Sequence, residues 1–167
     1  MRHSLPRTRG CYVCGKDNPA GLRLQMEAVD GRVVGMWDAS AVYAGYGNLL
    51  HGGLMMTLLD EVMTWAAILH ARQPCVAGEI TTRFLLPAPV EQTYQVVGWV
   101  ERARSRLLIT KGELRDPQGH VIAAAEGRYV PVSAERARLR PDDFVDPWTL
   151  DWALELRGGV PERTRGL

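Results

Sequence analysis

Residues 51–61 read HGGLMMTLLDE and place chemically reactive groups inside an apolar stretch. Asp60 and Glu61 are adjacent carboxylates in this stretch, and burying a carboxylate without a partner costs several kcal/mol. Such a placement therefore usually serves chemistry. Gly52 and Gly53 open the same stretch and would leave the first backbone N–H groups of a helix uncovered, where a developing negative charge could bind.

The spacing of these groups suggests a site shared by two chains. A helix rises ~1.5 Å per residue, so Asp60 would lie about 10 Å from a helix start near Gly53. One chain cannot easily bring this carboxylate to its own glycine amides, whereas two antiparallel helices related by a two-fold axis can. Acyl transfer suits such a site, because the amides can polarise a carbonyl oxygen while the carboxylate attacks the carbonyl carbon or activates a water.

Each of these residues also has a purely structural interpretation. His51 could cap the loop by bonding a backbone carbonyl, and the two glycines could form a turn that needs positive φ. Asp60 and Glu61 could form ion pairs with an arginine such as Arg83. The combination of all these features at this spacing favours the functional interpretation.

The surrounding sequence predicts a sheet built around one helix. Apolar residues recur with helical spacing over 53–70 on nearly every face, as in a buried helix. An Asp30-Gly31 hairpin turn and a type I turn over 116–119 join pairs of strands. We expect an α+β fold in which a curved antiparallel sheet wraps around one long central helix. The strands are predicted over 22–28, 32–37, 80–86, 94–102, 107–115 and 121–130.

The chain divides into three parts by composition. Residues 1–21 are rich in Arg, Gly and Pro and are expected to form an irregular N-terminal arm, whereas 22–132 form the folded domain. Residues 133–167 form a C-terminal extension with a predicted short helix over 147–156. We expect this extension to pack on its own domain or on a sister subunit.

Composition argues against several classes of function. The 167 residues carry a formal net charge of +1, which favours neither nucleic acid nor a strongly charged partner. No apolar run approaches the ~20 residues of a membrane span, so we expect no membrane partner. The basic N-terminus lacks the apolar core of a secretory signal. Three cysteines, an odd number, indicate a reducing compartment, and we expect a cytoplasmic protein.

Cys11 and Cys14, followed by Gly15, have the spacing of half a zinc site. A structural zinc ion needs four ligands, and Cys75, His3 and the other histidines offer them at no familiar spacing. We therefore expect no metal. Both cysteines are interpreted as small apolar residues that pin the N-terminal arm.

The segment HGGLMMTLLDE resembles the signature of hotdog-fold acyl-CoA thioesterases, in the PaaI-like (phenylacetate-degradation) branch of the 4-hydroxybenzoyl-CoA thioesterase superfamily. That branch has a glycine-containing loop, here 45–50, then HGG, then an acid nine residues after the histidine, here Asp60. Residues 80–90 (ITTRFLLPAPV) resemble the strand after the helix, and 11–25 (CYVCGKDNPAGLRLQ) resemble an N-terminal segment of many members. The resemblance covers roughly residues 11–132.

The resemblance implies a hotdog fold, a homo-oligomer (dimer or dimer of dimers) and hydrolysis of a thioester R–CO–S–CoA to free acid and coenzyme A, with no cofactor. Asp60 matches the nucleophile or general base. The Gly52 amide matches an oxyanion donor from the opposite subunit, and His51 matches a residue that binds or polarises the thioester carbonyl. Further substrate contacts are expected from Gly53, Asn48, Glu61 and Trp65.

The sequence also departs from the family pattern. Gly45 and Ala44 stand where some members have Asn or Gln, and Ala77 stands where many have a Ser or Thr that can orient the catalytic water. Asn48 could substitute for the missing polar group. Two alternatives therefore stay open: a hotdog protein that binds acyl-CoA without hydrolysing it, and an interaction protein that uses the C-terminal tryptophans. The acyl group and the choice between dimer and tetramer are not determined by the sequence.

Overall fold

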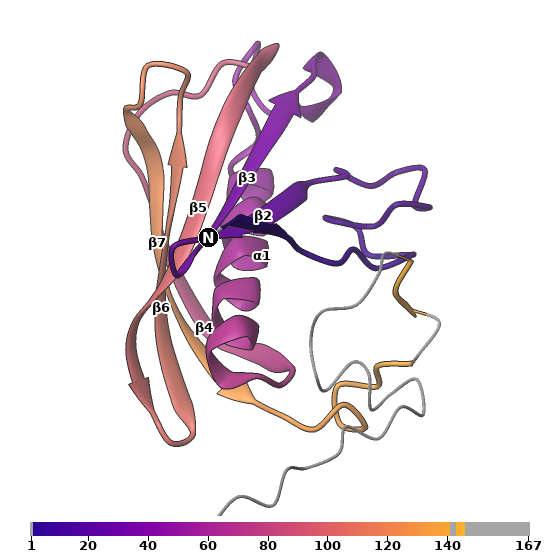
Figure 1. Ribbon diagram of the computed structural model, residues 1–167. Coiled ribbons are helices and arrows are strands. Elements are labelled where there is room, and N and C mark those ends of the chain that lie inside the picture. Colours follow the sequence, from indigo (N-terminus) through magenta and orange to yellow (C-terminus); the bar gives the residue numbers. More distant parts are fainter. Residues whose placement is uncertain (1, 141–142, 146–167) are drawn as a thin grey trace, which may run out of the picture.

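The computed structural model describes residues 2–140 and 143–145, in which one long helix packs against one sheet (Figure 1). In chain order the elements are β1 (Arg2–Ser4), β2 (Gln25–Val29), β3 (Arg32–Ala39), the 3-10 turn η1 (Ala41–Tyr43), α1 (Gly52–Ala71), β4 (Cys75–Phe84), β5 (Gln92–Arg104), β6 (Leu107–Arg115) and β7 (Val121–Pro131). The C-terminal helix predicted over 147–156 lies outside the described residues.

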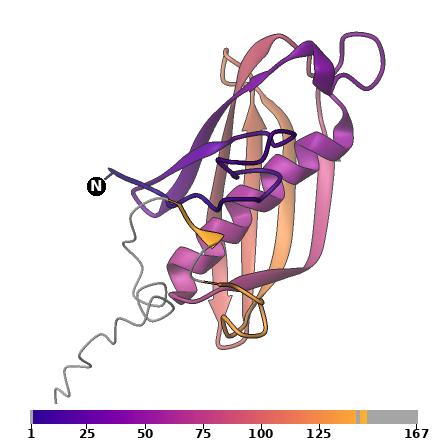
Figure 2. The same cartoon turned by 90° about the vertical axis from the view of Figure 1, so that its right-hand side faces the viewer.

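The strands form a single antiparallel sheet in the order β1-β2-β3-β5-β6-β7-β4. Figures 1 and 2 show this sheet curving around α1, with the N-terminal arm on the opposite side of the helix. The prediction of a curved antiparallel sheet around one long central helix is confirmed. The helix therefore lies between the sheet and the arm, although Met56 stays exposed and Asp60 and Thr64 are only half-buried.

Helix α1 is apolar because it forms the centre of the core. Leu58, Val62 and Met63 have no exposed surface. By length and composition the helix could cross a membrane, with a mean hydropathy of 1.3 over a window that is 50% buried. The expectation that no apolar run approaches membrane length is thus wrong, and packing of α1 against β4, β5, β6 and β7 accounts for its apolar character.

Both predicted turns are confirmed by their backbone geometry. Asp30 and Gly31 have φ of 48° and 79°, the left-handed pair that a two-residue hairpin between β2 and β3 requires. In the second turn the Gly119 N–H donates to the Asp116 carbonyl at 3.0 Å. The turns therefore set the register of their strands as the sequence indicates.

The first predicted strand begins later than expected because its start is bonded to the arm. The Leu22 N–H donates to the Tyr12 carbonyl at 2.8 Å, and the Leu24 N–H donates to the Val13 carbonyl at 2.8 Å. Alternation of apolar residues over 22–24 thus reflects packing beneath the arm, and sheet pairing starts at Gln25.

The N-terminal arm contains one strand that the sequence did not indicate. Arg2–Ser4 pairs with β2 at one edge of the sheet, so the prediction of irregular structure over 1–21 is wrong for these residues. An ion pair between Arg2 and Glu27 supports the pairing. A pairing between segments this far apart leaves no local periodic signal in three residues.

Strand β4 forms the opposite edge of the sheet and exposes apolar side chains there. It begins five residues before the predicted start at residue 80. Phe84, Leu85 and Leu86, at and beyond its end, are 50%, 52% and 47% exposed. Long edge strands that carry exposed apolar residues tend to pair with another chain.

Candidate functional site

The loop before α1 is anchored at both ends. The His51 N–H donates to the Tyr43 carbonyl at 3.0 Å, and the Val90 N–H donates to the Asn48 carbonyl at 2.8 Å. The first bond closes the glycine-containing loop on itself, and the second ties it to the segment that follows β4. Asn48 is exposed, so its side chain lies at the surface beside the start of the helix.

His51 caps the N-terminus of α1. Its Nδ1 accepts a hydrogen bond from the Gly53 N–H at 2.9 Å, so the capping interpretation is correct although the partner is an amide rather than a carbonyl. A Cβ atom on Gly53 would lie 3.1 Å from this nitrogen, which is tight. Glycine at this position therefore leaves room for the ring, and the rest of the imidazole is exposed.

The Gly52 amide is the available donor at this helix terminus. Among residues 2–140 and 143–145 no acceptor bonds it, whereas the Gly53 amide is already bonded to His51. The helix dipole adds partial positive charge at the same place. A polarised carbonyl oxygen could accept a hydrogen bond from Gly52, while Gly53 serves the cap.

Asp60 lies two turns further along α1, where two hydroxyl groups hold its carboxylate. Tyr129 donates to Oδ1 at 2.6 Å, and the Thr64 hydroxyl donates to the same oxygen at 3.2 Å. Burial, reinforced by the Asp60 charge, raises the pKa of Tyr129, so its phenol remains a donor. Within the described part of the chain Oδ2 has no hydrogen-bond donor, which leaves this oxygen for chemistry.

Sequence reasoning did not identify Tyr129, which is 69 residues away from Asp60 in the chain. The residue is fully buried on β7 among the side chains that face the helix. One signal could have indicated it, because a tyrosine at an inward position of a strand needs a partner for its hydroxyl. The identity of that partner depends on how helix and sheet pack.

Glu61 contacts the N-terminal arm. Its Oε1 accepts a hydrogen bond from the Trp65 indole at 3.3 Å, and its Oε2 lies 4.0 Å from Cys11 Sγ. Burial raises the pKa of Glu61 to about 7, and the neighbouring Cys11 and Asp60 charges act in the same direction. The adjacent carboxylates therefore have different surroundings: Asp60 contacts β7, and Glu61 lies beneath the arm.

The ion pair that the sequence left open is not formed. In the part of the chain that the structure describes, no ion pair includes Asp60 or Glu61, so the alternative of pairing with Arg83 is wrong. Arg83 is exposed and lines a separate cavity of about 410 Å³ on β4, β6 and β7. Both carboxylates are therefore in place without a structural cation.

A single chain does not bring Asp60 to the Gly52 amide. The two residues lie eight positions apart on α1, which corresponds to about 12 Å along the helix axis. His51 is farther still, one residue before the helix. The predicted groups therefore lie at two separate places along one helix.

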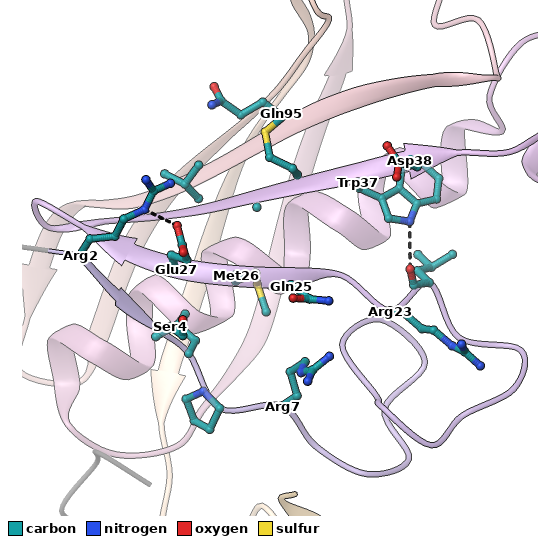
Figure 3. Close-up of a pocket in the computed structure, with 16 residues that line it drawn as sticks. Arg2, Ser4, Arg7, Arg23, Gln25, Met26, Glu27, Trp37, Asp38 and Gln95 are labelled. Atoms are coloured by element: carbon teal, nitrogen blue, oxygen red, sulfur yellow. Dashed lines mark hydrogen bonds and ion pairs between the residues drawn. The ribbon is translucent and has the colours of Figure 1, made fainter. Parts of the chain in front are cut away.

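A cavity of about 930 Å³ lies elsewhere, between the arm and strands β1, β2 and β3 (Figure 3). Arg2, Arg23 and Trp37 are among its lining residues, and the Trp37 indole donates to the Leu22 carbonyl at 3.1 Å. None of the predicted site residues lines it. This cavity and the reactive groups of α1 are separate features.

The departures from the family pattern have different structural settings. A Cβ atom on Gly45 would lie 3.3 Å from His51 Cα, so a polar side chain there would press on His51. Ala77 is exposed on β4 beside a register shift between Ala77 and Glu79. The first departure is therefore a consequence of close packing, whereas nothing in the structure explains the second.

Comparison with known proteins matches part of this chain to one family model. Residues 47–123 match the thioesterase superfamily. The uncharacterized protein C26H8.11c of Schizosaccharomyces pombe is 29% identical over 94 residues, which cover 53% of this chain and 54% of that protein. The chain thus spans about half the length of this curated relative.

Solved structures show the same architecture. Protein RHA08564, a thioesterase superfamily protein, is 27% identical with a TM-score of 0.68, and the match covers 73% of this chain and 60% of that one. The Escherichia coli PaaI protein of the phenylacetic acid degradation operon is 19% identical with a TM-score of 0.63, covering 67% and 81%. A Streptococcus mutans protein bound to acetyl CoA is 14% identical with a TM-score of 0.61, covering 66% and 89%. The hotdog fold that the resemblance implies is confirmed.

Proposed function

We propose that this chain, which has a hotdog fold, is an acyl-CoA thioesterase of the thioesterase superfamily whose active site forms between two subunits. The observation that carries the proposal is the pair of half-sites on α1. Asp60 presents one oriented carboxylate oxygen, and the Gly52 amide presents one unpaired donor. The acetyl CoA complex of the Streptococcus mutans neighbour supports a coenzyme A thioester as the ligand.

The reaction follows from the chemistry of these two groups. The thioester carbonyl oxygen accepts a hydrogen bond from the Gly52 amide, which stabilises the negative charge that develops during attack. The free oxygen of Asp60 either attacks the carbonyl carbon or removes a proton from an attacking water. The C–S bond breaks, coenzyme A leaves as the thiolate, and water completes the conversion of the acyl group to the free acid.

The exposed edge of the sheet supports an interface at β4. Among the described residues β4 pairs only with β7, and the apolar side chains of Phe84, Leu85 and Leu86 lie exposed near its end. The Phe84 ring also lies beside Gly52, since a Cβ atom there would be 3.4 Å from it. Two chains that pair edge to edge at β4, about a two-fold axis that sets their helices antiparallel, would cover these residues and bring each Gly52 toward the partner's helix.

Assay with a panel of acyl-CoA esters and a thiol-detecting dye tests the reaction. We expect release of free coenzyme A from at least one ester. The absence of a polar side chain at Ala77 favours one second candidate, a hotdog protein that binds acyl-CoA without hydrolysis. Tight binding without thiol release would support that candidate, and no affinity for any ester would contradict both.

Mixed dimers test whether the site is shared. Gly52→Pro removes the donor, and proline is tolerated at the first helical position. His51 has φ of −64° and ψ of 130°, which suits a residue before proline. If Gly52→Pro and Asp60→Asn chains are each inactive alone, their statistical mixture should recover about a quarter of wild-type activity, because half the dimers hold one intact site.

Gly52→Ala is the matched control for this experiment. It adds the same Cβ atom beside Phe84 at an ordinary contact distance but retains the N–H donor. We expect it to keep most of the activity. Recovery of no activity in the mixed dimers, measured after their formation is verified by differential tagging, would contradict a shared site.

Tyr129 is a positioning residue for Asp60, and Tyr129→Phe tests this role. Hydrogen bonds to charged groups contribute about 1.5–3 kcal/mol, so we expect kcat to fall about tenfold or more with little change in KM. Tyr94→Phe is the matched control, since this buried hydroxyl donates to the Pro89 carbonyl at 2.6 Å, outside the site. Equal kcat for the two variants would contradict the assignment.

A further inference from the structure

Three potential metal ligands meet where the N-terminal arm crosses helix α1. Cys11 Sγ, Cys14 Sγ and a carboxylate oxygen of Glu61 all lie within 4.8 Å of one another. The two cysteines come from the arm and Glu61 comes from the helix. The cluster therefore joins the arm to α1, which it crosses in Figure 2. The function proposed above uses none of these three side chains for chemistry.

The backbone that follows Cys11 turns tightly, and one of its amides donates a hydrogen bond to the Cys11 sulfur. The Val13 N–H donates to Cys11 Sγ at 3.3 Å, and the Gly15 N–H donates to the Cys11 carbonyl at 3.0 Å. A Cβ atom on Gly15 would lie 2.1 Å from that carbonyl oxygen, so only glycine allows the turn to close. Amide donation to sulfur favours the thiolate, which is the form that binds metals.

A second layer of contacts orients the ligands. The Trp65 indole bonds Glu61 Oε1, which leaves Oε2 directed at Cys11. The Thr8 hydroxyl lies 3.6 Å from Cys14 Sγ. Such outer partners fix the direction of first-layer ligands in metal sites.

We propose that Cys11, Cys14 and Glu61 bind one zinc ion, with water in the fourth position. Zinc takes thiolate sulfur at ~2.3 Å and carboxylate oxygen at ~2.0–2.2 Å in tetrahedral geometry. Tetrahedral ligands at those lengths lie ~3.6–3.8 Å apart, so the cluster closes on an ion with side-chain shifts of ~1 Å. Mixed thiolate and carboxylate donors suit zinc better than Cu(I), which prefers sulfur alone, or Mg²⁺, which prefers oxygen alone.

A zinc ion also gives the half-buried Glu61 carboxylate a cation. In the described part of the chain no ion pair includes this carboxylate. A disulfide between Cys11 and Cys14 would leave the carboxylate equally uncompensated. The divalent ion supplies the missing positive charge and clamps the arm to α1 one residue from Asp60. The third ligand comes from the helix, whereas the sequence pattern offered only the histidines and Cys75.

Cobalt substitution of the full chain tests the site. The protein is dialysed against a chelator under reducing conditions and titrated with Co²⁺, then with Zn²⁺. We expect a thiolate-to-cobalt charge-transfer band that saturates at one ion per chain and is displaced by Zn²⁺. The proposal would be overturned if the folded wild-type protein showed no such band. It would also be overturned if Cys11 and Cys14 formed a disulfide in the intact protein under reducing conditions.

Variants assign the ligands. Cys14→Ser should abolish the band and Glu61→Gln should weaken zinc binding, whereas Cys75→Ser is the matched control because this buried thiol lies outside the cluster. Trp65→Phe removes the hydrogen bond to Glu61 and should lower zinc affinity about 10-fold or more. An unchanged band in Cys14→Ser would overturn the proposal. The wild-type spectrum decides the matter even if a cysteine variant does not fold.

Discussion

Asp60→Asn is expected to lower kcat for acyl-CoA hydrolysis by about 10²–10⁴-fold, the range for removal of a positioned general base. Asparagine matches aspartate in shape, and its carbonyl oxygen can still accept the hydrogen bonds from Tyr129 and Thr64. It has no charge with which to attack a carbonyl carbon or deprotonate water. The loss should therefore appear in kcat, while KM and the fold change little. Initial rates with the best ester of the panel, measured by thiol release, give both constants.

Glu126→Gln is the matched control for this substitution. It makes the same carboxylate-to-amide change at an exposed position of β7 that belongs to neither half of the proposed site. We expect wild-type kinetics from it. Retention of more than a tenth of wild-type kcat by Asp60→Asn would exclude Asp60 as the nucleophile or base, and the chemistry would then have to be assigned elsewhere on α1.

The parts of the fold that the sequence predicts are those with local signals. The helix predicted over 53–70 extends from Gly52 to Ala71, because apolar residues at helical spacing have no other way to be buried together. The Asp30-Gly31 turn forms as predicted because its left-handed backbone suits these two residues. The position of His51 at the helix start also follows, since the two glycines that come next leave amides to be capped.

The parts that the sequence could not predict depend on contacts between distant segments. Pairing of β1 with β2, the bond from Tyr129 to Asp60, and the approach of Cys11 to Glu61 join residues 25, 69 and 50 positions apart. No periodic pattern encodes which strand faces which turn of a helix. The adjacent carboxylates could therefore be identified as unusual, but their separate surroundings required the packed structure.

Gly98→Ala is expected to lower the free energy of unfolding by about 3 kcal/mol, the upper part of the usual range for an overpacked core. A Cβ atom at Gly98 on β5 would lie 2.6 Å from the carbonyl carbon and oxygen of Val62 and 2.9 Å from the Met63 nitrogen. These are backbone atoms of α1, so no side-chain rotation can relieve the clash. The helix must move away from the sheet, and this shift also loosens the bond from Tyr129 to Asp60. Urea denaturation at one fixed protein concentration measures the change, because the stability of an oligomer depends on concentration.

Two other glycines calibrate this expectation, because they carry the same substitution into different surroundings. At Gly112 on β6 the added atom would lie 3.1 Å from Met63 Cγ and 3.2 Å from Leu59 Cδ2, which are side-chain atoms that can shift, so we expect a loss of about 1 kcal/mol. At Gly10 nothing lies within 4 Å, and the free energy of unfolding should change by less than about 0.5 kcal/mol. The predicted order of loss is Gly98, Gly112, Gly10. If Gly98→Ala were no less stable than Gly10→Ala, the close approach of helix to sheet, and with it the placement of Asp60 against Tyr129, would be contradicted.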